Sequence, residues 1–442
     1  MISPLRPAGR STARPKIDPA VTIRMTKRTF TAPSERNLFD RLGEVRRVIG
    51  KMESVTDGGS EPTLIVIGGL HGNEPSGVLA AASVLETLSK HDVGFRGRLV
   101  ALAGNLQALA ARERFMQSDL NRHWTESKIR RLRAAGDTDT LAGEDRELVE
   151  LLHELEAAIA SSQGEVFFVD LHTSSAHGPP FVTVGDTLRN RRFAFYLALP
   201  TVLGLEEQID GALLEYLNNR GVITMAVEGG SHLAESSVEN HTAALWMALA
   251  SAGMVDPKKV PDWDVLVARL NDAHRGIPPV IEVRYRHGIR PDEHFEMVPG
   301  FTNFDRIRKK QVLAKNRSGE IIAREDGRIL LPLYQGKGND GFFVARAVRP
   351  FWLHLSTWLR RLGAASFVRR LPGVRVHPTR PDTLVVNTRI AKFFPLEIFH
   401  LLGFRKLRWS GAHLMVSKRR FDIGGPIKDL SFEPSAQDLG ST

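Results

Sequence analysis

The stretch TLIVIGGLHGNEPSGVLAAASVLETL, residues 63–88, decides the fold class of this chain. It opens with a continuous apolar run, passes through two adjacent glycines and continues with an apolar pattern of helical spacing. A continuous apolar run of this length is typical of a strand covered on both faces of a sheet. The stretch therefore predicts a buried strand over residues 63–67 and a helix over residues 76–88.

Further apolar runs of the same kind follow along the chain. They are RLVALA at 98–103, EVFFVDL at 165–171 and VITMAV at 222–227. A second helical pattern covers residues 146–160. Strands that alternate with helices predict an α/β fold with a mixed, mostly parallel sheet flanked by helices, here over residues 37–255. The charged, Gly- and Ala-rich stretch at 125–143 is predicted to be an exposed connection.

The pattern changes after residue 255. Residues 278–348 contain short strand-like runs separated by turn signals such as SGE and DGR, which predicts a smaller all-β module over residues 256–348. Residues 349–424 combine aromatic residues with arginine clusters and are predicted to be a basic extension. Residues 1–36 are predicted to be a disordered basic tail, and residues 425–442 a second tail.

The composition limits the function classes. The chain has 442 residues, of which 42% are hydrophobic and 25% charged, as in ordinary globular proteins. It contains no Cys, so a disulfide framework and thiolate metal sites are excluded, and any metal must be bound by His, Asp or Glu. No apolar run is long enough to span a bilayer, and the N-terminus lacks the apolar core of a secretory signal. A cytoplasmic location is expected.

The net charge of +10 is unevenly distributed. Residues 346–422 hold 16 Lys and Arg against 3 Asp and Glu, and residues 1–36 hold 8 against 2, whereas the body between them is mildly acidic. This distribution argues against polyanion binding by the whole surface, but it leaves nucleic acid or membrane contact through residues 346–422 open. A folded basic cap whose aromatic residues are buried is the favoured interpretation of that segment.

Polar residues follow all four predicted strands of the α/β region, where sites form in open sheets of this kind. They are His71 and Glu74, then Asn105, Arg114, Asn121 and Arg122, then Asp170 and His172, and finally Glu228.

The pair His71 and Glu74 is one of four His-x-x-Glu pairs in the chain, and it alone follows a buried strand through two glycines. Together with His172 it would form a site of two His and one Glu. Such a set leaves a fourth position for water, as catalytic zinc requires. One zinc per chain is therefore expected, where it would polarise a carbonyl and acidify a bound water.

Hydrolysis at such a site also needs a base and cationic groups. Glu228 is the available carboxylate at the end of the fourth strand. Arg114 and Arg122 are suited to hold an oxyanion and a substrate carboxylate. Asp170 either caps the following turn or orients a ligand histidine.

The segments HGNEPSG, the block from Arg114 to DLNR, DLHTSSA and VEGG together resemble the succinylglutamate desuccinylase/aspartoacylase family, a branch of the zinc carboxypeptidase-like enzymes. The resemblance extends over roughly residues 60–345. It implies zinc ligands at His71, Glu74 and His172, a catalytic base at Glu228, an oxyanion-stabilising Arg114, and an Asn121–Arg122 pair for the substrate carboxylate. It also implies a β-rich C-terminal module. The segment LYQGKGNDGFF at 333–343 departs from the Tyr and Lys pattern of aspartoacylases, which argues against carrying over specificity for N-acetylaspartate.

These features predict a zinc-dependent amidohydrolase that removes the acyl group from a small N-acyl amino acid. One alternative is a zinc carboxypeptidase that acts on short peptides. Another is a polyanion- or membrane-associating protein that uses residues 346–422. The acyl group, the amino acid and the oligomeric state are left open by the sequence.

Overall fold

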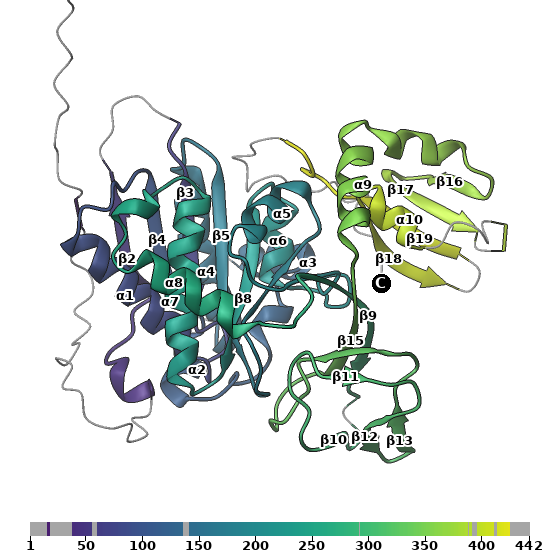
Figure 1. Ribbon diagram of the computed structural model, residues 1–442, viewed down its shortest axis with the longest axis horizontal. Coiled ribbons are helices and arrows are strands. Elements are labelled where there is room, and N and C mark those ends of the chain that lie inside the picture. Colours follow the sequence, from purple (N-terminus) through teal and green to yellow (C-terminus); the bar gives the residue numbers. More distant parts are fainter. Residues whose placement is uncertain are drawn as a thin grey trace, which may run out of the picture.

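A large mixed sheet organises the molecule. The computed structural model describes residues 16–17, 38–54, 60–135, 141–290, 292–387, 389–390, 396–410 and 413–424. Twelve described strands form the sheet in the order β1-β2-β4-β3-β5-β8-β6-β7-β9-β15-β14-β11. They are β1 (Lys16–Ile17), β2 (Val48–Glu53), β3 (Thr63–Gly68), β4 (Arg98–Ala103), β5 (Val166–Ser174), β6 (Phe181–Val184), β7 (Thr201–Leu203), β8 (Ile223–Ser231), β9 (Val280–Gly288), β11 (Arg306–Ile307), β14 (Gly327–Leu330) and β15 (Asp340–Ala347). Figure 1 shows the central strands β3, β5 and β8 of this sheet.

The centre of this sheet is mostly parallel. Strand β3 pairs in parallel with both β4 and β5, β5 pairs in parallel with β8, and β7 pairs in parallel with β6 and β9. Antiparallel pairs occur at β6–β8 and towards both edges, at β1–β2–β4 and at β9–β15–β14–β11. The predicted α/β fold class is therefore confirmed, and the four predicted strands correspond to β3, β4, β5 and β8.

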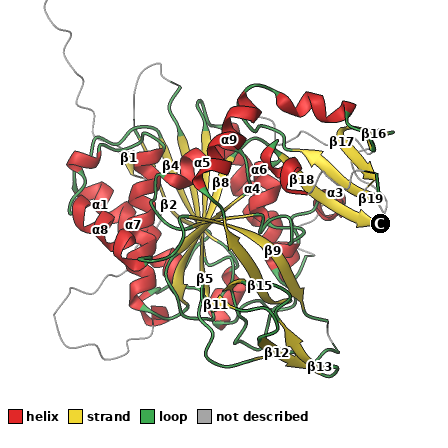
Figure 2. Ribbon diagram, turned by 45° about the vertical axis from the view of Figure 1, so that its right-hand side comes forward, coloured by secondary structure: helices red, strands yellow, loops and turns green. Residues whose placement is uncertain are grey.

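Helices cover both faces of the sheet (Figure 2). They are α1 (Ser76–Lys90), α2 (Leu106–Ala111), α3 (Glu126–Ala135), α4 (Gly143–Ala160), α5 (Leu188–Phe195), α6 (Leu213–Asn218), α7 (Glu235–Ser251) and α8 (Trp263–Ala273), with short 3-10 helices η1 (Leu38–Arg41), η2 (Leu120–Arg122) and η4 (Pro257–Lys259). Leu64 and Val66 of β3 pack with α1 and α7, whereas Ile65 of the same strand packs with α4 on the other face. Burial of alternate residues on opposite faces explains why this strand is apolar throughout.

The stretch at 125–143 differs from the prediction. Helix α3 lies within it, and its Ile129 and Leu132 are buried in the core beside α4. These two residues are three positions apart and so lie on one face of the helix. The prediction of an exposed connection was wrong here because two apolar residues anchor an otherwise charged helix.

The β-rich segment is present, but it divides between two sheets. Strands β9, β15, β14 and β11 extend the large sheet, whereas β10 (Glu296–Met297), β12 (Val312–Asn316) and β13 (Gly319–Ile322) form a separate antiparallel sheet. Helix α8 lies beyond the predicted boundary at residue 255, and its Leu270 belongs to the core of the α/β part. The domain boundaries given above therefore remain a proposal.

The basic extension forms a folded unit with its own core. It contains α9 (Pro350–Arg361), η5 (Ala364–Arg370), α10 (Leu396–Leu401) and an antiparallel sheet of β16 (Val374–His377), β17 (Arg380–Asn387), β19 (His413–Lys418) and β18 (Phe404–Ser410). Phe399 and Phe404 are buried in this core, in agreement with the interpretation as a cap. Phe351, Trp358 and Phe367 are exposed, so burial of all its aromatic residues was wrong.

Buried ion pairs attach this C-terminal unit to the α/β part. The Arg360 guanidinium of α9 donates to Asp186 Oδ2 at 2.7 Å, and Arg191 contacts the same carboxylate. Arg419 likewise donates to Glu206 Oε1 at 2.7 Å. Burial raises the pKa of Asp186, but Arg191 and Arg360 outweigh it and hold this pKa well below its usual value.

Most of the predicted tails lie outside the described residues. Lys16–Ile17 is the exception, because it forms β1 and pairs with β2. The prediction of a disordered tail is therefore wrong at these two residues. None of the described helices is long and apolar enough to cross a membrane.

Candidate active site

The loop between β3 and α1 presents His71 and Glu74 at the carboxyl end of the sheet. Its glycines permit a turn that other residues would block. A Cβ at Gly72 would lie 2.0 Å from the carbonyl carbon of Ala108, and Gly69 has a φ of +71°. The predicted strand, glycine turn and helix therefore bring both side chains towards one point.

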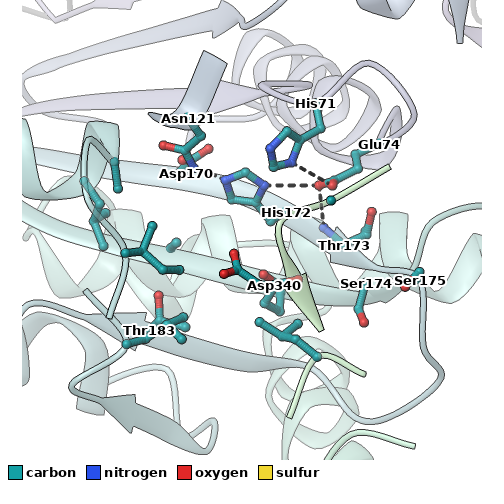
Figure 3. A pocket seen from close by; sticks show the side chains of 18 of the residues that line it. His71, Glu74, Asn121, Asp170, His172, Thr173, Ser174, Ser175, Thr183 and Asp340 are labelled. Atoms are coloured by element: carbon teal, nitrogen blue, oxygen red, sulfur yellow. Dashed lines mark hydrogen bonds and ion pairs between the residues drawn. The ribbon is translucent and has the colours of Figure 1, made fainter. Parts of the chain in front are cut away.

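His71, Glu74 and His172 form one buried cluster (Figure 3). Glu74 lies between the two imidazoles: its Oε1 is 2.9 Å from His71 Nδ1, and its Oε2 is 3.1 Å from His172 Nδ1. Ligand atoms of the three residues all lie within 4.8 Å of one another. The sequence-predicted set therefore comes together from β3–α1 and β5.

Each imidazole is held from behind by a second carboxylate. His71 Nε2 lies 3.1 Å from Asp119 Oδ1, and His172 Nε2 lies 2.9 Å from Asp170 Oδ2. Carboxylates in this position orient metal-binding histidines and increase their basicity. Two imidazole nitrogens and one carboxylate, buried and supported in this way, fit a metal ion of the kind that prefers nitrogen and oxygen ligands.

The charges in the cluster stabilise one another. Burial raises the pKa of Glu74, but His71 and His172 outweigh it and hold this pKa well below its usual value. Burial lowers the pKa of His172, yet Asp170 and Glu74 raise it well above the usual value. Glu74 is thus an anion throughout the neutral range, as a metal ligand must be.

Glu228 has a different environment. It lies on β8 directly beside His172 of β5 in the parallel register. Burial raises the pKa of Glu228 to about 7. Its Oε2 is buried and has no hydrogen-bond partner among the described residues. A carboxylate that is neither neutralised by a close partner nor fixed by hydrogen bonds can exchange a proton near neutral pH.

Arg114 lies at the edge of the cluster. It donates from Nη2 to Asp119 Oδ2 at 3.1 Å, and its Nη1 lies 3.6 Å from Glu74 Oε1. Asp119 therefore holds both His71 and Arg114. Asp119 was not among the site residues predicted from sequence, although it stands within the DLNR block and its side chain accepts a hydrogen bond from the backbone of η2.

Asn121 and Arg122 line the same cavity as His71. Asn121 Oδ1 accepts a hydrogen bond from the backbone of Leu213 at 2.9 Å, which fixes η2 against α6. Arg122 Nη2 donates to Asp340 Oδ2 at 2.7 Å, and Asp340 also contacts Arg286. One of the two terminal nitrogens of the Arg122 guanidinium is therefore bound to a carboxylate from β15.

The segment before β15 contributes Gln335 to the lining of the cavity. Gln335 Oε1 accepts from Asn73 Nδ2 at 2.9 Å and lies 3.1 Å from His232 Nε2. His232 in turn contacts the Thr173 hydroxyl at 2.8 Å. The cavity has a volume of about 150 Å³. Gln335 comes from the β-rich segment and was not assigned from sequence, since no local pattern relates it to residues near 71.

Comparison with known proteins identifies the part of the chain that carries this cluster. Residues 60–238 match the family model of the succinylglutamate desuccinylase/aspartoacylase catalytic domain. This part of the chain has the sequence pattern of a succinylglutamate desuccinylase/aspartoacylase catalytic domain. The resemblance inferred from its motifs is thereby confirmed.

Two solved structures share the fold of about two-thirds of this chain. A succinylglutamate desuccinylase/aspartoacylase from Rhodobacter sphaeroides is 18% identical, with a TM-score of 0.50 over 68% of this chain and 89% of that one. A succinylglutamate desuccinylase from Vibrio cholerae is 13% identical, with a TM-score of 0.51 over 69% of this chain and 86% of that one.

A curated relative, described as a probable aspartoacylase from Acaryochloris marina, is 28% identical over 137 residues. The match covers 30% of this chain and 42% of that protein. This chain therefore matches less than half the length of that relative.

Proposed function

We propose that this chain is a zinc-dependent deacylase that hydrolyses the amide bond of small N-acyl amino acids. The observation that carries the proposal is the juxtaposition of the His71–Glu74–His172 cluster with Glu228 in one cavity. Membership of residues 60–238 in the catalytic-domain family supports the same conclusion.

The three clustered residues would hold one zinc ion per chain. Zinc bound there supplies a Lewis acid for the amide carbonyl and lowers the pKa of a coordinated water. Asp119 and Asp170 keep His71 and His172 oriented for this task, through the contacts of their Nε2 atoms.

Glu228 acts as the base and then as the acid. Its carboxylate accepts a proton from the attacking water and passes that proton to the departing amine nitrogen. A pKa of about 7 suits both directions of transfer at neutral pH. The free Oε2 of Glu228 is the atom that receives the proton.

Arg114 stabilises the negative charge that develops on the carbonyl oxygen. Asp119 holds its Nη2, so the guanidinium is oriented before substrate binds. Its Nε is buried without a hydrogen-bond partner among the described residues. A donor already in place costs no reorganisation during the reaction.

Arg122 binds the carboxylate of the substrate. A guanidinium has five N–H donors, and the contacts of Arg122 with Asp340 and the Asn121 carbonyl use one on each Nη. Its Nε has no partner among the described residues, so donors remain for a carboxylate. Asp340 then orients Arg122, and Asn121 lies beside the bound group.

The size of the cavity favours small substrates over peptides. Its volume of about 150 Å³ suits a small N-acyl amino acid better than a longer peptide. A carboxypeptidase that acts on short peptides is accordingly the second candidate, and the substrate assay below separates the two.

The test combines metal analysis with a panel of substrates. The purified chain is expected to contain one zinc and to hydrolyse N-acyl amino acids with a free carboxylate, more slowly their carboxamides, and short peptides least. His172→Ala should remove both zinc and activity, whereas His153→Ala, an exposed histidine of α4, should change neither. Full zinc content in His172→Ala, or peptides as the best substrates, would contradict the proposal.

A further inference from the structure

Helix α9 leaves large apolar side chains exposed while it buries polar ones. Its two fully buried residues are polar, Ser356 and Arg360, whereas Phe351, Trp358 and Leu362 are 65%, 60% and 61% exposed. In a surface helix of a globular protein the apolar face normally packs inward. Leu353 and Leu359 of α9 pack against the neighbouring cores, whereas Phe351, Trp358 and Leu362 lie at the surface.

Polar contacts fix the helix in this orientation. The Arg360 side chain is only 1% exposed and donates to Asp186 Oδ2 at 2.7 Å and to Asp422 Oδ1 at 3.2 Å. The Ser356 hydroxyl donates to the Leu401 carbonyl at 2.9 Å. Rotating α9 to bury its aromatic residues would break this buried ion-pair network, at a cost of several kcal/mol. The exposed face is thus built into the attachment of the C-terminal unit.

The exposed residues form a line along the helix. Phe351, Trp358 and Leu362 are separated by seven and four residues, which places them on one stripe. Phe367 follows in η5 and is 62% exposed. We call Phe351, Trp358, Leu362 and Phe367 the aromatic strip.

Cationic side chains accompany the aromatic strip. Arg361, Arg369 and Arg370 are exposed, and the Arg370 guanidinium lies 5.6 Å from the centre of the Phe367 ring. Residues 350–371 contain no Asp or Glu. Residues 346–422 as a whole carry 16 basic against 3 acidic residues.

This combination determines the kind of partner. Aromatic rings and leucine beside arginines match the boundary between lipid headgroups and acyl chains, where the rings enter the apolar layer and the guanidiniums contact phosphates. A second copy of this chain would bring the same arginines close to one another. A nucleic acid would use the arginines but would leave the aliphatic Leu362 in water.

We propose that the aromatic strip and its arginines dock the C-terminal unit on an anionic membrane surface. Docking is peripheral, since none of the described helices can cross a bilayer. It is independent of the proposed hydrolase activity, because no residue of α9 or η5 lines the cavity of the His71–Glu74–His172 cluster.

The test is co-sedimentation of the full chain with lipid vesicles. Vesicles of phosphatidylcholine with about one-third phosphatidylglycerol should bind the chain, pure phosphatidylcholine vesicles should bind it weakly, and raised salt should reduce the binding. The double substitution Phe351→Ser, Trp358→Ser should weaken partitioning about tenfold or more. Arg361→Gln, Arg369→Gln and Arg370→Gln should each weaken it about fivefold.

Control substitutions outside the aromatic strip show whether the loss of any exposed apolar or charged side chain weakens vesicle binding. Val265→Ser removes an apolar side chain of α8 that is 64% exposed, and Arg275→Gln removes a charge whose side chain is 81% exposed. Both should leave vesicle binding unchanged, and the melting temperatures of all variants should match the wild type.

Three results would overturn the proposal. The first is vesicle binding that is equally strong without anionic lipid or unaffected by both sets of strip substitutions. The second is RNA binding that depends on the arginines in the absence of any vesicle binding. The third is a dimer in solution that dissociates in Phe351→Ser, Trp358→Ser, which would identify a second copy as the occupant.

Discussion

Two clusters of buried charged residues in this molecule contain similar carboxylates but serve different purposes. At the His71–Glu74–His172 cluster the carboxylate lies between two imidazoles. At the attachment of the C-terminal unit, Asp186 lies between the guanidiniums of Arg191 and Arg360. Imidazole loses its proton readily and then binds metals, whereas guanidinium stays charged at every accessible pH. The first cluster can exchange protons and ligands; the second can only hold two parts of the chain together.

The largest effect is expected from breaking the first cluster. His71→Ala should reduce zinc from one per chain to near zero and abolish hydrolysis, because two remaining ligands cannot retain the ion. The melting temperature of the metal-free wild type provides the reference for folding. Zinc content is measured by elemental analysis. A His71→Ala chain that keeps zinc would place the metal elsewhere.

Glu228→Gln should keep zinc and the fold but lower kcat by about 10²–10⁴-fold, the usual contribution of a general base. Burial raises the pKa of Glu228 to about 7, so the wild-type rate should fall as the pH decreases through that value and the base becomes protonated.

The pH–rate profile is the discriminating measurement for Glu228. Its acidic limb should be absent from the residual activity of Glu228→Gln. An unchanged limb in this variant would assign the titration to another group, and loss of zinc would make Glu228 a ligand.

The second cluster should affect stability without affecting the metal. Arg360→Leu leaves Asp186 buried with one fewer partner and should lower the free energy of unfolding by about 3–5 kcal/mol. Arg361→Leu, the exposed neighbour on the same helix, is the control and should change it little. Denaturant unfolding measures both. Equal effects of the two substitutions would show that the Asp186 pair is not a structural attachment.

The smallest effect is expected at Asp340, a carboxylate that forms an ion pair with Arg122 inside the cavity of the proposed active site. Asp340→Asn weakens the contact that orients Arg122 and should raise KM for N-acyl amino acids about tenfold, the equivalent of about 1.4 kcal/mol. Zinc content and the pH profile should be unchanged. Asp292→Asn, an exposed carboxylate of the same β-rich segment, serves as control. A fall in kcat without a change in KM would mean that Asp340 does not act through substrate binding.

The sequence predicted the parts of the site that follow from local patterns. Strand β3 and helix α1 were evident because one is apolar throughout and the other begins just past a glycine turn. His71, Glu74, His172 and Glu228 each follow or end a buried strand, so the parallel topology alone brings them to one edge of the sheet.

The remaining features depend on contacts between distant segments. Asp340 meets Arg122 across 218 positions, and neither residue has a neighbouring pattern that points to the other. The aromatic residues Phe351 and Trp358 of α9 have helical spacing, which normally indicates a core face. In the structure, however, the buried ion pair of Arg360 with Asp186 fixes the helix so that these two side chains face outward. Which face of a helix is buried depends on the interactions each face can make with the rest of the protein, and the spacing of residues in the sequence does not reveal these interactions.

The continuity of the large sheet has a practical consequence for anyone who shortens this protein. Strand β9 pairs with β7, and β15 pairs with β9, so cutting the chain near residue 255 would leave β7 as an open edge. Unprotected edge strands pair readily with other molecules and promote aggregation. A truncated catalytic domain would keep His71, Glu74 and His172 but lose Gln335 and Asp340. Such a fragment should be difficult to keep in solution, and its pocket should lie open to water.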